Sequence, residues 1–316
     1  MRRLLSGFAL VVLSWAAHAQ FPAKPIRVVV PFPAGSATDT VSRVLSASVS
    51  QAIGQSVVVE NKAGADGAIA ATEVAKSPAD GYTLLMATNS PMSAVPAMKK
   101  TPPYDPVADF TPITDIGRYT FFIVVHPDVP AKSLDELIAY ARTNPGKLNY
   151  ATGNTTGIVS TAFFAAQAQI KMVHVPYKGE PQALTDLVAG RVQVMFCSSG
   201  TSVPQIREGK LRALVTTLPR RSHLLPEVPT IAEAGMPQFS ITSWAGLFGP
   251  AKMPRAVVER LNREFVAAMG RADVQAAMEK QAFALSPSSP ERLADFVKQQ
   301  MEAYRNTLRA AGVEPE

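Results

Sequence analysis

The chain is organised around the segment Pro31-Phe32-Pro33-Ala34-Gly35-Ser36-Ala37-Thr38-Asp39, which joins the first predicted strand to the first predicted helix. Residues 26–30 are an apolar, β-branched run typical of a strand, and apolar residues at helical spacing begin at Val41. Gly35 lets the backbone approach a ligand closely. Ser36, Thr38 and Asp39 stand where the helix begins, and its first N–H groups have no intrahelical partner. Such a helix start attracts anions, so the loop predicts a site for a carboxylate or a phosphate.

The same order of strand, polar loop and helix recurs along the chain. Further strands are predicted over residues 57–60, 82–87, 121–125, 148–151, 172–176, 192–196, 211–216 and 240–249. Their alternation with helical stretches predicts an α/β fold with doubly wound, parallel sheets, in which ligands bind at the carboxyl ends of strands. The proline-rich residues 101–112 predict an extended surface connection, and the chain from Pro254 onward is predicted to be helical.

The predicted strands fall into two groups, joined by two crossings near residues 120–126 and 238–246. We expect residues 20–123 and 242–316 to form one discontinuous lobe and residues 124–241 to form a second lobe inserted into it. With 316 residues, 47% of them hydrophobic, the chain is long enough for two such domains. This hinge architecture lets a cleft between the lobes close around a solute.

Polar residues follow several other predicted strands at the edge where the cleft opens. Thr88 lies in the loop after the third strand, and residues 152–157 form a second polar, glycine-containing loop before a helix. Tyr177 and Ser198 also follow strands, and we place both near the cleft. For each hydroxyl residue the alternative is an ordinary helix cap, worth about 1 kcal/mol. Two such loops in separate units nevertheless predict a pair that faces across the cleft.

The first 19 residues predict a secretory signal peptide. They contain Arg2 and Arg3, a short apolar run over 10–13, and Ala17-His18-Ala19 before a cleavage site at Gln20. We therefore expect an exported, periplasmic protein. Without this segment the chain has 29 basic and 25 acidic residues, a net charge of +4. The basic residues are scattered, which argues against a nucleic-acid partner.

The sequence lacks the usual motifs of an enzyme. It contains no Gly-x-Ser-x-Gly elbow, no His-Glu-x-x-His motif, no P-loop and no Gly-x-Gly-x-x-Gly. His126, His174 and His223 are scattered, and Cys197 is the single cysteine, so no intrachain disulfide can form. We therefore predict a binding protein without a metal or cofactor, and a periplasmic enzyme is the less favoured alternative.

Six segments of the chain resemble the extracytoplasmic solute receptors of tripartite tricarboxylate transporters, the Bug family. The resemblance covers essentially the whole chain after residue 19 and is highly specific. The segments are Pro31-Phe32-Pro33-Ala34-Gly35-x-x-x-Asp39, Val59-Glu60-Asn61-Lys62-x-Gly64-Ala65-x-Gly67, Pro78-x-Asp80-Gly81-Tyr82-Thr83, Pro176-Tyr177-Lys178-Gly179, Asp186-Leu187-x-x-Gly190 and Trp244-x-Gly246-Leu247-Phe248-x-Pro250.

This resemblance implies a type II periplasmic-binding-protein fold, with two lobes around a cleft. It also implies a carboxylate ligand, held by two strand-to-helix loops partly through ordered water and then passed to permease subunits in the membrane. The family's binding loops correspond to Phe32, Ala34, Gly35, Ser36, Thr38, Asp39 and Thr88 in one lobe, and to Thr152, Asn154, Thr155 and Thr156 in the other. The chain departs from the family pattern at Ser36 and Asp66, where glycines are common, and at residues 154–159.

We expect the ligand's carboxylate to be bound by neutral N–H and hydroxyl donors, without an obligatory arginine. Asp39 has three candidate roles in such a site: it caps its helix, accepts a hydrogen bond from an amino or hydroxyl group of the ligand, or holds a bridging water. Dicarboxylates, tricarboxylates, acidic amino acids and aromatic acids all fit the loops. We expect a monomer, and a sensor that docks on a two-component kinase is the alternative to a transport receptor.

Overall fold

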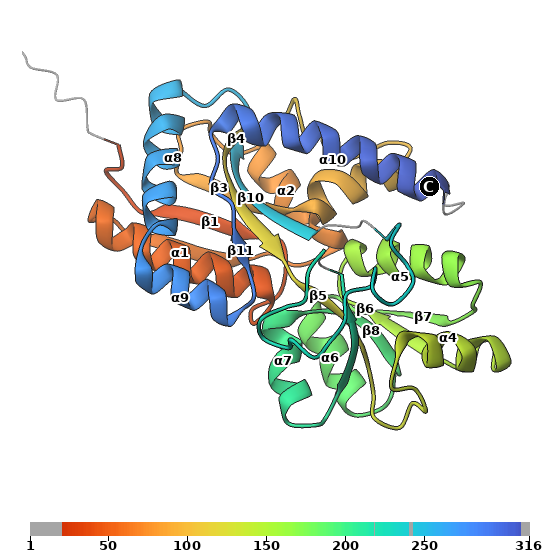
Figure 1. Ribbon diagram of the computed structural model, residues 1–316. Helices are drawn as coiled ribbons and strands as arrows, with labels where there is room; N and C mark the ends of the chain where they lie inside the picture. Colours follow the sequence, from red (N-terminus) through yellow and green to blue (C-terminus); the bar gives the residue numbers. More distant parts are fainter. Residues whose placement is uncertain (1–20, 218, 240–242, 311–316) are drawn as a thin grey trace, which may run out of the picture.

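The computed structural model describes residues 21–217, 219–239 and 243–310, which form two lobes (Figure 1). The predicted signal peptide and the predicted lobe boundary between residues 241 and 242 lie outside these residues. Each lobe is built on one β-sheet with helices on both faces. The predicted two-lobed α/β fold is confirmed. No helix in the described ranges combines the length and the apolar character that crossing a membrane requires.

The first lobe contains a six-stranded sheet in the order β11-β4-β10-β3-β1-β2. Its strands are β1 (Ile26–Val30), β2 (Val57–Asn61), β3 (Thr83–Thr88), β4 (Phe110–Tyr119), β10 (Ser243–Pro250) and β11 (Ala284–Leu285). β1 pairs in parallel with β2 and β3, whereas β10 runs antiparallel to β3 and β4. The sheet is mixed because β10 begins beside the carboxyl end of β3, where Ala245 pairs with Thr88.

The second lobe contains a five-stranded sheet in the order β7-β6-β8-β5-β9. Its strands are β5 (Phe121–Val125), β6 (Asn149–Thr152), β7 (Val173–Pro176), β8 (Val194–Ser198) and β9 (Arg212–Thr216). β6 is parallel to β7 and β8, and β5 is antiparallel to β8 and β9. Both sheets are therefore mixed, and the wholly parallel pairing expected from the sequence is wrong for the strands beside the crossings.

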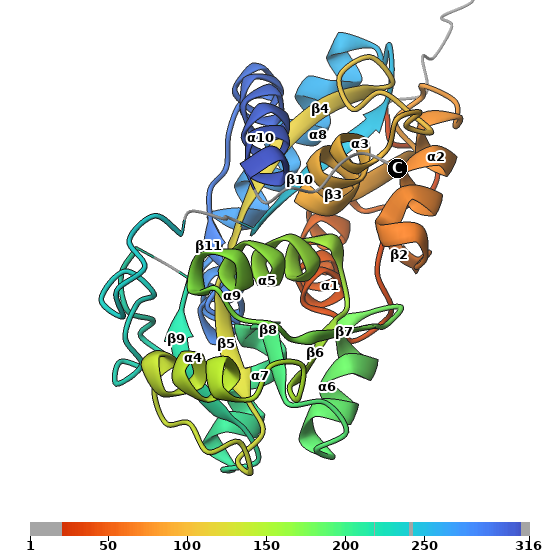
Figure 2. The ribbon, with the colours of Figure 1, turned by 90° about the vertical axis from the view of Figure 1, so that its right-hand side faces the viewer.

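Alternating residues of the strands cover both faces of each sheet, as period-two geometry requires. In β1, Val28 packs in the core below α1, whereas Val29 packs in a second core below α2 and α10. The first lobe's helices are α1 (Ala37–Ile53), α2 (Ala68–Ala75), α3 (Val95–Met98), α8 (Arg255–Met269), α9 (Ala272–Lys280) and α10 (Pro290–Ala310). Figures 1 and 2 show α10 lying along the outside of this lobe.

The second lobe follows the same rule. Its helices are α4 (Leu134–Thr143), α5 (Thr155–Ala168), α6 (Glu180–Val188) and α7 (Ser199–Arg207). In β5, Ile123 packs in the core that includes α4 and α5, and Phe122 packs in the core that includes α6 and α7. The four helices thus sandwich the sheet and place the starts of α5, α6 and α7 at one edge of it.

The chain passes from one sheet to the other at Thr120, the single residue between β4 and β5. The Thr120 hydroxyl donates a hydrogen bond of 2.6 Å to the Ala282 carbonyl of the first lobe. The predicted lobe boundary after residue 123 falls inside β5, so the sheets divide three residues earlier. The limits of the lobes as moving bodies stay a prediction.

Two stretches of the chain differ from the sequence-based expectation. The predicted surface connection over 101–112 gives way to β4 at Phe110, and this strand holds Pro112 beside an irregularity in its pairing with β10. Proline is tolerated in a sheet at such a bulge. The second is α7, a helix in a stretch between two predicted strands to which no element was assigned, and its Gly200 and Pro204 lower helix propensity.

Trp244 on β10 anchors the core between the first sheet and α10. Its side chain is fully buried and packs edge-on against Phe296 of α10, with a ring-centroid distance of 5.3 Å. The ring also contacts Phe248 on the same strand. β10 is the strand with which the chain re-enters the first lobe, and it begins beside the cleft. The packing of Trp244 therefore holds this strand in place.

We expect Trp244→Ala to lower the free energy of unfolding by about 3–5 kcal/mol, because a large cavity replaces a buried aromatic side chain. Urea denaturation measures the change. The matched control is Val58→Ala on β2, where 52% of the side chain is exposed and little change is expected. Equal effects of the two substitutions would contradict the role of Trp244.

Candidate ligand-binding site

The predicted binding loops lie at two helix starts that face the same cavity. Ser36 is the N-cap of α1, where its Oγ accepts a hydrogen bond of 3.3 Å from the Asp39 N–H. Asn154 is the N-cap of α5, where its Oδ1 accepts a hydrogen bond of 2.9 Å from the Gly157 N–H. Each helix start brings unpaired N–H groups and the positive end of a helix dipole to the edge of the cleft.

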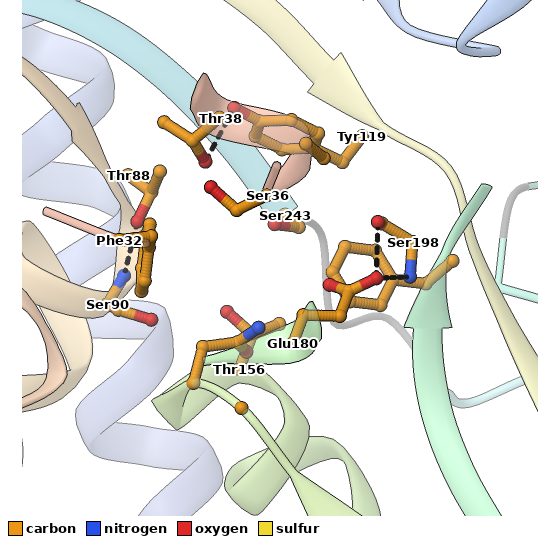
Figure 3. Close-up of a pocket in the computed structure, with 14 residues that line it drawn as sticks. Phe32, Ser36, Thr38, Thr88, Ser90, Tyr119, Thr156, Glu180, Ser198 and Ser243 are labelled. Atoms are coloured by element: carbon orange, nitrogen blue, oxygen red, sulfur yellow. Dashed lines mark hydrogen bonds between the residues drawn. The ribbon is translucent and has the colours of Figure 1, made fainter. Parts of the chain in front are cut away.

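The cavity lies between the two lobes and is lined mainly by neutral polar and aromatic residues (Figure 3). Its lining residues are Phe32, Ser36, Ala37, Thr38, Thr88, Ser90, Tyr119, Phe121, Gly153, Asn154, Thr156, Glu180, Ser198 and Ser243. Its volume is about 30 Å³, room for roughly two water molecules. A larger solute therefore enters only if side chains or whole lobes move apart.

The structure brings seven of the predicted site residues together on this cavity, namely Phe32, Ser36, Thr38, Thr88, Asn154, Thr156 and Ser198. Thr152 and Tyr177 line a neighbouring cavity of about 310 Å³, which shares Phe32, Gly153 and Asn154 with the first. Ala34, Gly35, Asp39 and Thr155 line neither cavity. Direct contact between a ligand and any of these residues stays a prediction.

Asp39 is turned toward the protein and holds the first loop in shape. One carboxylate oxygen accepts hydrogen bonds of 3.0 Å from the Gly35 N–H and from Arg43 Nε. The other accepts a hydrogen bond of 2.9 Å from Asn61 Nδ2, which also donates to the Phe32 carbonyl. Ser36 caps the helix instead, so the capping role considered for Asp39 is wrong.

The environment of Asp39 favours its ionised form. Burial alone raises the pKa of a carboxyl group, but hydrogen bonds from Arg43, Gly35 and Asn61 outweigh it, so the pKa of Asp39 lies below its ordinary value. The side chain is 5% exposed, whereas that of its partner Arg43 is 52% exposed. The negative charge of Asp39 is therefore compensated before any ligand approaches.

The sequence analysis missed Tyr119, Phe121 and Ser243, which approach the site from the two crossings between the lobes. Tyr119 is the last residue of β4, and its hydroxyl donates a hydrogen bond of 3.0 Å to Thr38 Oγ1. Burial raises the pKa of Tyr119 well above its ordinary value, so it remains a neutral phenol. The sequence offered one indication of this position, because the aromatic residues Tyr119 and Phe121 flank Thr120 at the predicted crossing.

Asn89 is a further residue that was not predicted from the sequence, and its hydrogen bonds connect the two lobes. Its amide nitrogen donates hydrogen bonds to Thr156 Oγ1 of α5 and to the Tyr304 hydroxyl of α10. Its amide oxygen accepts hydrogen bonds from Ser243 Oγ and the Trp244 N–H, at 3.1 Å and 3.4 Å. Asn89 thus ties the start of α5 to the core of the first lobe.

Glu180, the first residue of α6, was also missed. It is 5% exposed and lines the cavity. Its Oε1 accepts hydrogen bonds from the Ser198 N–H at 2.8 Å, from Ser198 Oγ at 2.5 Å, and from the Thr201 hydroxyl and the Cys197 thiol. Burial first, and the charge of Glu180 second, raise the pKa of Cys197, which is therefore a neutral thiol. In the sequence, the indication of this position was a glutamate directly before Pro181, a residue typical of the first turn of a helix.

The two lobes also lie close together at Gly179, just before Glu180. A Cβ atom on Gly179 would lie 2.5 Å from the Pro33 ring of the first loop. The φ angle of Gly179 is −177°, an extended conformation open to any residue. The glycine is therefore required by the space between the lobes and not by its backbone.

The described residues contain no group of three or more His, Cys, Asp or Glu side chains arranged to hold a metal ion. Among the residues that line the cavity, Glu180 and Tyr119 are the titratable ones, and none is Lys, Arg or His. Hydrogen-bond donors and helix starts, rather than a basic side chain, are therefore the groups that can bind an anion here.

Comparisons with known proteins identify close relatives of the chain. The family model described as the tripartite tricarboxylate transporter family receptor matches residues 41–313. A protein of Pseudomonas sp. strain P51, described as the UPF0065 protein in the tcbD-tcbE intergenic region, is 40% identical over 97% of this chain and 93% of its own length. This relative therefore aligns with nearly the whole chain.

Solved structures agree with this result. Rpa4515 of R. palustris, determined with adipate, has a TM-score of 0.90 and 33% identity, covering 94% of this chain and 100% of its own. The periplasmic binding protein BugD has a TM-score of 0.90 and 31% identity over 94% and 100% of the two chains. MatC of Rhodopseudomonas palustris, with bound malate, has a TM-score of 0.87 and 31% identity over 91% and 100%. The expected resemblance to the Bug receptors is confirmed.

We expect Asp39→Asn to destabilise the fold at neutral pH by about 1–3 kcal/mol, because the variant loses charged hydrogen bonds. A lowered folded-state pKa stabilises the protein above the unfolded-state pKa, near 4, and this contribution is lost as the pH falls through the folded-state value. The difference from wild type should therefore shrink between pH 7 and pH 3. Urea denaturation at both pH values measures it.

Asp128→Asn is the control for this experiment, because the Asp128 side chain is 92% exposed. It should change stability little at either pH. A destabilisation by Asp39→Asn that is equal at pH 7 and pH 3 would show that the charge of Asp39 does not matter.

Proposed function

The chain belongs to the tripartite tricarboxylate transporter receptor family, and we propose that it binds a small carboxylate between its lobes and delivers it to a permease of that transporter class. One observation carries the proposal. The starts of α1 and α5, one from each lobe, meet at a single cavity lined by hydroxyl and amide groups. A carboxylate there links both lobes through hydrogen bonds and thereby favours their closure.

The physical basis is the strength of hydrogen bonds to a charged acceptor in a site that excludes water. Bonds between N–H or hydroxyl donors and a carboxylate contribute about 1.5–3 kcal/mol each, more than bonds between neutral groups. The dipoles of two helices add to this attraction within their first turns. Removing solvent when the lobes close strengthens both effects.

The related structures support a carboxylate ligand. Rpa4515 was determined with adipate and MatC with malate, and both share the fold of this chain over more than nine-tenths of its length. Family members with known structures include a periplasmic binding protein, which supports a receptor rather than an enzyme. No comparison described above supports the alternative of a sensor-kinase partner.

The cellular setting follows from the same family. We propose that residues 1–19 direct export to the periplasm, where the receptor works as a monomer and docks on the permease subunits of its transporter.

Isothermal titration calorimetry with a panel of small monocarboxylates, dicarboxylates and amino acids, adipate and malate included, tests the proposal. We expect at least one acid to bind, and Ser36→Ala to weaken its binding by about tenfold or more, since one hydrogen bond to a charged group is lost.

Ser133→Ala is the matched control for Ser36→Ala. Ser133 is the N-cap of α4 in the same way, with its Oγ accepting a hydrogen bond of 3.2 Å from the Glu136 N–H, but it lies outside the cavity. Both substitutions should cost similar stability, about 1 kcal/mol, whereas only Ser36→Ala should weaken binding. Equal loss of affinity in the two variants, or no binding of any acid by wild type, would rule the proposal out.

A further inference from the structure

The cavity that we assign to a carboxylate ligand has one acidic side chain and no basic side chain among its lining residues. The acidic side chain is that of Glu180, which is more than nine-tenths buried. Within the described parts of the chain, no Lys, Arg or His forms an ion pair with Glu180. A buried carboxylate without a cationic partner is costly unless something else compensates it.

The protein compensates one side of the Glu180 carboxylate and leaves the other for the cavity. All four hydrogen bonds in the described structure go to Oε1, from Ser198, Thr201 and Cys197. Oε2 accepts none of them, and Figure 3 shows this oxygen on the side of the cavity, opposite the Ser198 backbone. The hydrogen bonds fix the orientation of the carboxylate, so that Oε2 is held as an acceptor toward the interior.

This arrangement is poorly suited to a ligand with a carboxylate at each end. Two carboxylates brought together in a site of low dielectric repel each other, and one of them must take up a proton. A ligand with a positive group at the far end meets the opposite situation. Its positive group compensates Glu180 and donates a charged hydrogen bond to the one acceptor oxygen that faces it.

We propose that Glu180 selects a ligand with an ammonium group, so that the solute of this receptor is a zwitterionic amino acid and not a dicarboxylate. The inference rests on the proposed function, in which the starts of α1 and α5 bind the carboxylate of the solute. Glu180 of α6 then binds its ammonium group. The specificity of the site follows from the placement of one acidic residue among neutral donors.

A hydroxyl group also donates to a carboxylate, but it leaves the buried negative charge in place. An ammonium group compensates that charge and also donates a hydrogen bond to Oε2. It therefore offsets more of the free-energy cost of desolvating Glu180 when the lobes close. The preference for ammonium over hydroxyl at the same chain length thus separates charge pairing from simple hydrogen bonding.

Calorimetric titration of the full-length mature protein with matched acids tests the proposal. The probes are 4-aminobutyrate, 4-hydroxybutyrate and glutarate, the longer pair 5-aminopentanoate and adipate, and L-alanine. We expect the tightest amino acid to bind wild type at least tenfold more tightly than the dicarboxylate and the hydroxy acid of matched length. This ranking needs no variant.

Glu180→Gln then removes the charge while keeping an acceptor for the Ser198 N–H. We expect the amino acid to lose at least tenfold in affinity and the dicarboxylate to gain. Glu227→Gln is the control, because Glu227 is exposed and lies outside the cavity, and it should leave the ranking unchanged. Thermal unfolding of each variant shows that it is folded before its affinity is compared.

The outcomes distinguish this inference from the proposed function. If wild type binds dicarboxylates more tightly than amino acids, and Ser36→Ala weakens them, the receptor function stands and the role of Glu180 is overturned. A hydroxy acid that binds as tightly as the matched amino acid overturns it too. If wild type binds none of these acids and none of the wider panel, both proposals fall.

Discussion

The hydrogen bonds of the buried Asp39 carboxylate are the constraint on which the site depends. They take the Gly35 N–H, hold the Arg43 guanidinium and fix Asn61, which in turn holds the Phe32 carbonyl. The loop between β1 and α1 is therefore anchored to β2 on its outer side. Its inner side presents Ser36 and Thr38 to the cavity. Asp39 therefore holds this loop in shape, because its negative charge is already compensated by Arg43 on the side away from the cavity.

The two loops face each other because contacts between the lobes hold them there, in addition to the hydrogen bonds within each loop. Asn89 connects the start of α5 to α10 and β10, while Thr120 holds the crossing between β4 and β5 against the Ala282 carbonyl. Apolar contacts add to them, since Val159 of α5 packs in one cluster with Ala94 and Leu308 of the first lobe. The arrangement of the lobes in this structure therefore depends on both polar and apolar contacts.

Local patterns allowed much of this structure to be predicted, and long-range contacts explain what was missed. The spacing of apolar residues located β1 and α1, and the residue types of Ser36 and Asn154 indicated helix starts. Pro112 concealed β4, since a proline is compatible with a strand there only through the irregular pairing with β10. Tyr119, Ser243 and Glu180 reach the cavity from elements distant in sequence, and nothing local revealed that they converge. The role of Asp39 depends on Asn61, 22 residues away.

Gly179 of the second lobe faces the Pro33 ring of the first, where a β-carbon would lie only 2.5 Å from that ring. Any β-carbon at position 179 acts as a spacer that raises the energy of the compact conformer and leaves the splayed one untouched. Apparent affinity equals intrinsic affinity reduced by the fraction of molecules able to reach the compact conformer. On the proposed opening and closing of the lobes, the absence of a β-carbon at position 179 therefore favours the compact conformer and raises the apparent affinity for a solute.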